Sequence, residues 1–390
     1  MTFYVDPAFF VFVAIAVIPA IVLGFMEKPL RSYGLVVSVL FIILLFHKDL
    51  ASFAAFLFYL ALSTTMAMLY QKVHSEKKPS AKMLYPVALV CAIAPLVIYK
   101  VSAVFDGNLL GFLGISYITF KTVQVIIETH DNLITDMRVR DYFYFLIFFS
   151  PFTSGPIMRS REFVKDVQRV YTRGEYQNLL AKGVLWFVLG AFYKMVCASL
   201  FSVAIWAIPK ALGDTSLAMD MLGQIGSAYA YGFYLFFDFA GYSFMAMGVG
   251  AAFGINMPRN FKAPFISIDI KDFWNRWHIT LSFWLRDFVF MRLVRTIRRK
   301  KLISSRLTTT CVAYLANMTL MGLWHGLTPH YIAYGFYHGA LLALNELFQK
   351  TSFYKRVKDK KAYKVISWLV TFNLIMVGFA LFSGQIPLGG

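Results

Sequence analysis

Charged residues are scarce in this 390-residue sequence. Only 15% of the residues are charged, whereas a soluble domain has about a quarter, and 59% are hydrophobic, with a mean hydropathy of +0.62. An apolar excess of this size has to face something other than water, and lipid hydrocarbon is the natural candidate. We therefore expect an integral membrane protein rather than two or three soluble domains.

Acidic residues are scarcer than basic ones. The sequence has 20 Asp and Glu against 38 Lys and Arg, which gives a net charge of +18. In a soluble protein this balance would suggest a nucleic-acid partner. Here the basic residues lie in short loops between apolar runs, where they set membrane topology and touch anionic lipid. We expect no nucleic-acid partner.

Cysteine is also rare, and several catalytic motifs are missing. Cys91, Cys197 and Cys311 lie far apart in apolar stretches without a CxxC pair, which argues against a disulfide framework or a cysteine-based metal site. There is no HExxH, GxSxG or GxxxxGK[ST] motif, so we expect no bound metal, and covalent serine catalysis and phosphate-loop chemistry lack support. The N-terminus has no basic n-region, and residues 9–23 resemble a first span rather than a cleaved signal.

Long apolar runs recur along the whole chain. Each is near or somewhat below the ~20 residues that cross a bilayer as a helix. Basic and weakly charged loops alternate between the first runs, which places the N-terminus outside by the positive-inside rule. We predict about ten or eleven transmembrane helices plus one or two partial ones, with apolar runs at 8–25, 33–46, 52–70, 84–99, 178–208, 217–254, 308–327, 331–349 and 365–383.

Some apolar segments are interrupted. Residues 148–159 (FFSPFTSGPIMR) contain two prolines and a glycine, which favours a re-entrant or broken element buried in protein. The chain shows no internal repeat, and we interpret it as one all-α polytopic membrane domain. Within it we distinguish N-terminal helices at 1–105, a core at 106–345, and a basic loop with the last span at 346–390.

The densest polar stretch is residues 271–287 (KDFWNRWHITLSFWLRD). If this stretch were one helix, Trp274, Trp277 and His278 would share a face, and Asp272 would lie one turn before Arg276, close enough to pair. Polar groups at this density beside membrane-length apolar runs are costly unless the protein uses them. The stretch is therefore a candidate functional site.

A second candidate is His325, within residues 321–326 (MGLWHG). Gly322 and Gly326 allow backbone or substrate to approach closely, and imidazole can act as base and acid near neutral pH. A structural histidine that bonds a neighbouring helix fits the residues equally well. For His338 we expect a helix-packing hydrogen bond, and for Asp238 a buried Arg or Tyr partner.

Five motifs together resemble the membrane-bound O-acyltransferase (MBOAT) family. They are GISYITF at 114–120, SGPI at 154–157, DFAGY at 238–242, DFWNRWH at 272–278 and LWHG at 323–326. Residues 260–265 (NFKAPF) and 283–293 (FWLRDFVFMRL) look like the branch that D-alanylates teichoic acids in Gram-positive bacteria. The alginate-acetylating branch usually has an acid where this chain has Phe244, which argues against that branch.

The resemblance implies a fold with a central tunnel, a catalytic role for His325 and a tunnel-lining role for His278. It also implies a D-alanyl thioester donor on the phosphopantetheine arm of a small, acidic cytosolic carrier protein, with no other cofactor. The implied acceptor is a teichoic acid hydroxyl outside a bacterial plasma membrane, and a small membrane partner protein would fit as an intermediate acceptor.

Within that mechanism we expect His325 to accept the proton of the attacking hydroxyl. The candidates for lining the tunnel or stabilising the oxyanion are Asp238, Trp274, Asn275, Arg276, Trp277, Trp324 and Gly326. Residues 292–306 carry seven Lys or Arg and no acid, and they are either a docking surface for the carrier or a topology signal in contact with lipid. The docking candidates are Arg292, Arg295, Arg298, Arg299, Lys300, Leu302 and Ile303.

Two other classes of function remain open from the residues alone. A transporter or flippase would use a buried Asp, Arg and His, although transporters usually show internal repeats, which this chain lacks. A non-catalytic scaffold for a carrier protein predicts that both histidines can be replaced without loss. Within the family, acyl transfer to an exopolysaccharide is the alternative.

Overall fold

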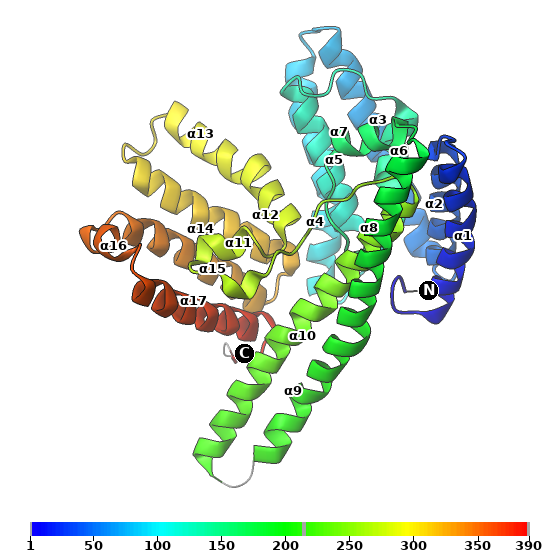
Figure 1. Cartoon of the computed structure of the whole chain (residues 1–390). Coiled ribbons are helices and arrows are strands. Elements are labelled where there is room, and N and C mark those ends of the chain that lie inside the picture. Colours follow the sequence, from blue (N-terminus) through cyan, green and yellow to red (C-terminus); the bar gives the residue numbers. More distant parts are fainter. Residues whose placement is uncertain (1, 213–215, 388–390) are drawn as a thin grey trace. The chain divides into compact units, whose positions relative to one another are not determined.

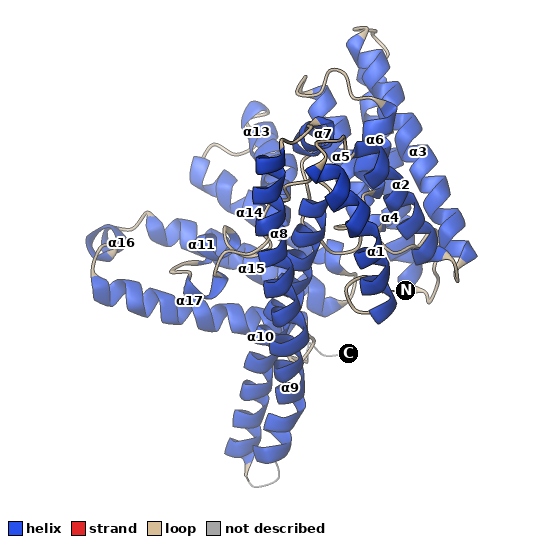
Figure 2. Cartoon of the chain, turned by 45° about the vertical axis from the view of Figure 1, so that its right-hand side comes forward, coloured by secondary structure: helices blue, strands red, loops and turns tan. Residues whose placement is uncertain are grey.

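The computed structural model describes residues 2–212 and 216–387, and all regular structure in this part of the chain is helical (Figure 1, Figure 2). The predicted all-α class is therefore confirmed. The contacts divide the chain into two compact units. The first contains the residues up to Ala191 together with Tyr242–Pro258, and the second contains Phe192–Gly241 and the residues from Arg259 onward.

The first unit is a bundle in which α3, α4 and α5 pack against one another. Helix α5 is buried along almost its whole length, from Tyr117 to Thr129, as expected for a run that mixes small and polar residues into apolar sequence. The helices of this unit are α1 (Pro7–Phe25), α2 (Arg31–Phe46), α3 (Leu50–Ser75), α4 (Ala81–Val104), α5 (Ile115–His130), α6 (Val139–Ile147), α7 (Ser160–Gln168), α8 (Arg173–Ala191) and the last part of α10 (Leu217–Ala252).

The predicted broken element at 148–159 is confirmed. It is an irregular, largely buried connection between α6 and α7, and its polar groups are satisfied by neighbouring helices. The Ser38 hydroxyl accepts from the Phe149 N–H at 3.4 Å, and the Ser150 hydroxyl donates to the Ala246 carbonyl at 2.7 Å. The Tyr242 hydroxyl bonds Thr153. Irregular backbone at membrane depth is stable only with such partners.

A buried lysine completes this arrangement. Lys121 of α5 is 2% exposed, and its Nζ donates to the carbonyls of Phe145 and Leu146 at 2.8 and 3.2 Å. These carbonyls lie at the C-terminal end of α6, where no further turn of helix supplies donors. The lysine therefore satisfies a helix end that the break would otherwise leave unpaired.

The second unit has a tight helical hairpin, α14 (Arg306–His325) and α15 (Pro329–Gln349), with α17 (Lys361–Phe382) packed on α15. A Cβ added to Gly322 would lie 2.3 Å from the Tyr331 carbonyl oxygen and 3.0 Å from the Gly335 Cα. Glycine at these positions lets the two backbones touch, as in many membrane helix pairs. The remaining elements are η1 (Phe192–Ala198), α9 (Ser199–Leu212), the first part of α10, η2 (Pro264–Ile266), α11 (Ile270–Trp274), α12 (Ile279–Leu285), η3 (Arg286–Phe290), α13 (Met291–Arg299) and α16 (Ser352–Val357).

Six helical stretches in the described residues are long and apolar enough to cross a membrane. Exposed apolar side chains cover several of them, for example Ile18 of α1 and Val203 of α9, which are 63% and 67% exposed. The protein is thus an integral membrane protein, and its predicted total of ten or eleven spans stays a prediction. The six are Pro7–Phe25, Leu50–Ser75, Ala81–Val104, Arg173–Leu212, Leu217–Ala252 and Lys361–Phe382.

Candidate active site

The polar stretch at 271–287 is not one continuous helix. It is divided into α11 and α12 by a break at Asn275–His278 and continues as the π-helical η3. His278 at the break has a left-handed backbone, with φ of 42°. The expected sharing of one helix face by Trp274, Trp277 and His278 was therefore wrong. Instead, a sharp turn places His278 immediately before α12.

Asn260 holds this turn in place. Its backbone carbonyl accepts from the Ile279 N–H at 2.9 Å, and its side-chain oxygen accepts from the Thr280 hydroxyl at 2.6 Å. The first N–H groups of a helix have no partner within it, so Asn260 supplies acceptors at the start of α12. Asn260 is completely buried, which makes these bonds strong determinants of the turn.

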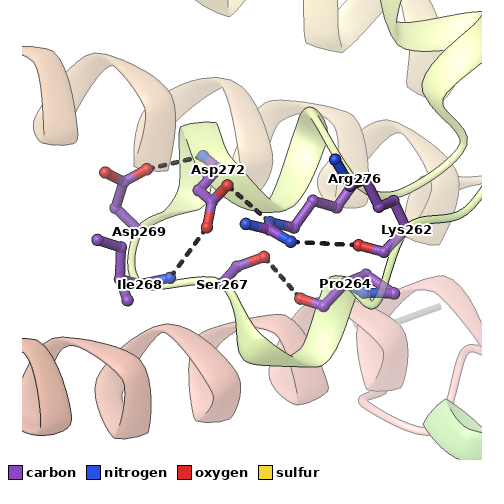
Figure 3. Close-up of polar contacts among 7 residues, drawn as sticks. All are labelled: Lys262, Pro264, Ser267, Ile268, Asp269, Asp272 and Arg276. Atoms are coloured by element: carbon purple, nitrogen blue, oxygen red, sulfur yellow. Dashed lines mark hydrogen bonds and ion pairs between the residues drawn. The ribbon is translucent and has the colours of Figure 1, made fainter.

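The expected pairing of Asp272 with Arg276 is confirmed. Figure 3 shows the Arg276 guanidinium held by the Asp272 carboxylate, with an Nε to Oδ1 distance of 2.7 Å, and directed at the Lys262 carbonyl at 3.4 Å. The other Asp272 oxygen accepts from the Ile268 N–H at 3.4 Å. The pair fastens the connection before α11 to the break after it.

His278 itself is buried against aromatic rings. It is 4% exposed, its ring lies edge-on to Phe239 of α10 at 4.7 Å, and its Nδ1 has no hydrogen-bond partner among the described residues. Burial, with a smaller contribution from a positive charge on His325, lowers the pKa of His278 to about 3. The imidazole in this connection, outside the six candidate spans, is therefore neutral at physiological pH.

His325 ends α14 within a ring of aromatic side chains. Its imidazole lies 4.5 Å from the Trp324 ring, 5.0 Å from Phe382 and 6.2 Å from Tyr334. A positive charge on His325 would lower the pKa of His278, which places the two predicted histidines in one region of the second unit. The close approach expected at Gly322 and Gly326 is made by α15, because a Cβ on Gly326 would lie 2.4 Å from the Tyr331 ring.

A cavity of about 270 Å³ (the channel) lies in the second unit among α11, α12, η3, α14 and α15, and neither His278 nor His325 is among its lining residues. Its wall includes the tunnel candidates Trp274 and Asn275. Two of the lining residues carry a buried polar atom, Trp274 Nε1 and Asn317 Oδ1, that has no hydrogen-bond partner among the described residues. The lining residues are Lys271, Trp274, Asn275, Ser282, Phe283, Leu285, Arg286, Phe290, Met291, Tyr314, Asn317, Met318 and Leu342.

Several predicted site residues do not line this channel. Arg276 is engaged by Asp272, and Trp277 stacks on Phe273 at 5.6 Å within an aromatic cluster. Asp238 pairs with Lys194 of η1. The expected Arg or Tyr partner was wrong, because the π-helical turn presents a lysine there.

A third histidine, His338, is buried next to the site. His338 is completely buried between Trp274 and Tyr334, with ring distances of 5.2 and 4.7 Å. Neither ring nitrogen has a partner among the described residues, so the expected helix-packing hydrogen bond was wrong. Within the described ranges, no cluster of three or more His, Cys, Asp or Glu has a geometry that could hold a metal ion.

The predicted docking surface is a basic amphipathic helix next to the channel. In α13, Ile297 is buried while Arg295, Arg298 and Arg299 are exposed, and Arg292 is half-buried. After the helix, Lys300 and Leu302 are exposed, Leu302 by 66%, and Ile303 is half-buried. Phe290 and Met291, which precede these arginines, line the channel.

Comparison with known proteins decides the class. The model of the membrane-bound O-acyltransferase family matches residues 25–383. The chain belongs to the membrane-bound O-acyltransferase family. This confirms the resemblance of the motifs, and it makes the protein an O-acyltransferase of the membrane.

Among members of the membrane-bound O-acyltransferase family, the similarity extends over nearly the full length of some relatives. The chain is 39% identical to the teichoic acid D-alanyltransferase of Streptococcus thermophilus, over 98% of this chain and 94% of the relative. It is 36% identical to that of Bacillus subtilis, over 99% and 98%. Similarity to the probable alginate O-acetylase of Azotobacter vinelandii, at 32%, covers 70% of this chain and 51% of the relative.

The structure adds residues that motifs of the membrane-bound O-acyltransferase family did not point to. Asn317 and Tyr314 of α14 line the channel, and Tyr334 faces His325. An asparagine within an apolar span is a signal that sequence analysis could have used, because such residues usually bond across helices or face a cavity. The aromatic contacts carry no comparable signal.

Proposed function

We propose that the protein moves D-alanine from a thioester on the phosphopantetheine arm of a cytosolic carrier protein to a teichoic acid hydroxyl outside the bacterial plasma membrane. The names of the two near-full-length relatives support the acyl group and the acceptor. The donor and the roles of the residues are supported by the chemistry of the channel and by its position beside α13.

The observation that carries the donor assignment is a pair of unpartnered polar atoms that belong to residues lining the channel. The indole N–H of Trp274 is a donor only, and the side-chain amide of Asn317 offers an acceptor oxygen. Both residues are over nine-tenths buried, and an unpaired buried polar group costs about 1–3 kcal/mol. A pantetheine arm carries amide carbonyls and amide N–H groups on an otherwise apolar chain, so it would satisfy both atoms.

The docking surface fits the same donor. A carrier protein with an acidic face would meet Arg295, Arg298 and Arg299, and the neighbouring Phe290 and Met291 line the channel. Charge complementarity mainly raises the rate of encounter and fixes the orientation. An arm attached to a carrier bound at α13 would therefore enter the channel rather than search the membrane surface.

In the transfer step, His325 takes the proton of the acceptor hydroxyl as the hydroxyl oxygen attacks the thioester carbonyl. The C–O bond forms, the C–S bond breaks, and the proton passes from His325 to the leaving sulfur, which restores the free thiol. His278, neutral because of its burial, contributes shape and a ring nitrogen to the same region rather than a positive charge. Aromatic side chains leave His325 half-buried, and the reduced access of water limits hydrolysis of the thioester.

The direct test uses purified protein in liposomes. Radiolabelled D-alanyl carrier protein is enclosed and teichoic acid is supplied outside. The native chain is compared with His325→Ala, and with His47→Ala as a matched control in an exposed turn of the first unit. We expect the label to reach the acceptor with the native chain and the control, and a loss of at least 100-fold with His325→Ala, within the range for a general base.

Two results would contradict the proposal. Equal transfer by His325→Ala would make His325 structural. Label that crosses the membrane without becoming esterified would favour a transporter. A second pair of variants addresses the donor: Trp274→Phe and Asn317→Leu should raise the KM for the carrier protein several-fold, because each removes a hydrogen bond to the arm. An unchanged KM in both variants would show that the arm does not bind in this channel.

A further inference from the structure

A second cavity lies in the same unit, away from the channel. It is a groove of about 670 Å³ between α15 and α17, and Phe353 and Val357 of α16 line it as well. Its walls are mainly apolar and remain open: Leu344 and Ile366 are each 60% exposed, and Val370 is 53% exposed. A groove of this size and composition is typical of a binding site for an apolar ligand.

The groove opens on the surface of a candidate membrane span. α17 is one of the six candidate spans, and Ile366 and Val370, which line the groove, are exposed on its surface. A water-soluble ligand or a cytosolic protein would have to pass through hydrocarbon to enter between these side chains. A membrane amphiphile reaches the same place by lateral diffusion.

A basic segment contributes Lys360 to the wall of the groove. Residues 350–364 contain seven basic residues and one acid, Asp359. One of the seven, Lys350, is paired with Glu346 at 3.5 Å. Lys360 lines the groove and is exposed, so its ammonium group can reach both the groove and the membrane surface. A polybasic segment next to a membrane span attracts anionic lipid headgroups.

We propose that this groove binds an anionic phospholipid, with an acyl chain between α15 and α17 and the phosphate at Lys360. The one acid in the groove does not oppose this arrangement strongly, because its carboxylate is engaged. Asp269 accepts from the Asp272 N–H at 2.8 Å and from the Gln349 side chain at 3.2 Å.

The bound lipid would touch the segment that leads to the active site. Asp269 and Ile270, at the start of α11, line the groove, and α11 carries Trp274 toward the channel. α17 also contacts this segment, because the Ser367 hydroxyl donates a hydrogen bond to the Ile268 carbonyl at 2.5 Å. An acyl chain in the groove would therefore pack against the segment that leads into α11. Because a ligand that binds only the folded state stabilises it, anionic lipid should raise the melting temperature of the protein.

The test measures lipid binding without any acyl donor, so its outcome is independent of the proposed acyl transfer. The full-length protein in detergent is titrated with phosphatidylglycerol or phosphatidylcholine, and bound lipids are counted by native mass spectrometry. We expect a first phosphatidylglycerol to bind more tightly than phosphatidylcholine. Lys360→Gln should weaken it about fivefold, the equivalent of ~1 kcal/mol per basic residue at a lipid surface.

Matched variants separate the groove from the charged surface. Lys358→Gln removes the same charge from the same loop outside the groove and should change the affinity less than twofold. Val370→Trp fills the groove and should abolish the first binding event, whereas Leu369→Trp, on the neighbouring exposed position, should not. The proposal is overturned if the two lipids bind equally, if both lysine variants weaken binding alike, or if Val370→Trp keeps the bound lipid.

Discussion

The ion pair between Asp272 and Arg276 offers a quantitative test of how the break at His278 is held. The two side chains are each 27% exposed, and the Nε to Oδ1 distance is 2.7 Å. Replacing Asp272 with Ala removes this contact and the weaker bond from the Ile268 N–H at 3.4 Å. The connection before α11 and the turn after it then lose their direct link.

The size of the effect follows from the exposure of the pair. A hydrogen bond to a charged group contributes about 1.5–3 kcal/mol, whereas exposed ion pairs contribute about 0–1 kcal/mol. A pair that is one quarter exposed falls between these limits, at about 1–2 kcal/mol. If a loss of 2 kcal/mol appeared entirely in the barrier to transfer, the rate would fall about 30-fold.

The assay is a double-mutant cycle with Asp272→Ala, Arg276→Ala and the double variant. Both the transfer rate in liposomes and the melting temperature in detergent are measured for each. The two single variants should lose a similar amount, and the double variant should lose little more than either, which gives a coupling energy of about 1–2 kcal/mol. The matched control is the cycle on Arg169 and Glu175, an exposed pair at 2.6 Å in the first unit, which should show no measurable coupling.

Strictly additive losses would refute this reasoning. Additivity within about 0.3–0.5 kcal/mol is the behaviour of independent sites, and it would mean that Asp272 and Arg276 act through other neighbours. A loss of transfer without any coupling would point instead to a direct role of Arg276 in the reaction.

Three further predictions concern the parts that support the site. Lys121→Met should lower the melting temperature by several degrees in a thermal scan, because two buried carbonyls lose their donor, whereas Lys182→Met on the exposed face of α8 should not. Gly335→Leu should abolish the yield of folded protein in size-exclusion chromatography, since a Cβ there lies 2.4 Å from the Met318 carbonyl oxygen, whereas Gly174→Ala has open space and should fold normally. Asn260→Ala should lower the free energy of unfolding by about 1–3 kcal/mol, because the start of α12 loses a side-chain acceptor. The loss should appear as a lower melting temperature together with slower transfer, and unchanged values would show that Asn260 does not hold the turn at His278.

The positions of the long helices were predictable because their apolar runs are nearly uninterrupted. The run at 33–46 became α2 (Arg31–Phe46), and the run at 365–383 became α17 (Lys361–Phe382). Proline and glycine likewise predicted the broken segment at 148–159. In these places the local sequence and the folded structure agree, so composition alone carried the information.

The break at His278 was not predictable from local pattern. Residues 272–285 contain no glycine or proline, and their apolar spacing continues through the turn as it would in a helix. The left-handed backbone of His278 is stabilised by Asn260, 18 positions earlier, through a carbonyl and a side-chain oxygen. A tertiary contact of this kind overrides propensity and leaves no periodic signal.

The channel was predictable only in part. Trp274 and Asn275 were candidates because they lie in a polar stretch, and both line it. Asn317 was missed because a single amide in an apolar span looks like a packing residue. Asp238 was expected to meet Arg or Tyr, and its Lys194 partner depends on a π-helical turn that sequence patterns do not reveal.

The buried segment at 148–159 sets an order of events during synthesis. Ser150 bonds a carbonyl of Ala246, a residue 96 positions later in the chain. At 5–20 residues per second, the ribosome needs about 5–20 s to make that partner. During this time the irregular backbone has no final acceptor or donor from α10, so it has to be sheltered by the insertion machinery or held near the aqueous interface. Chains truncated before Tyr242 should therefore be recognised by membrane proteases even though their first helices are complete.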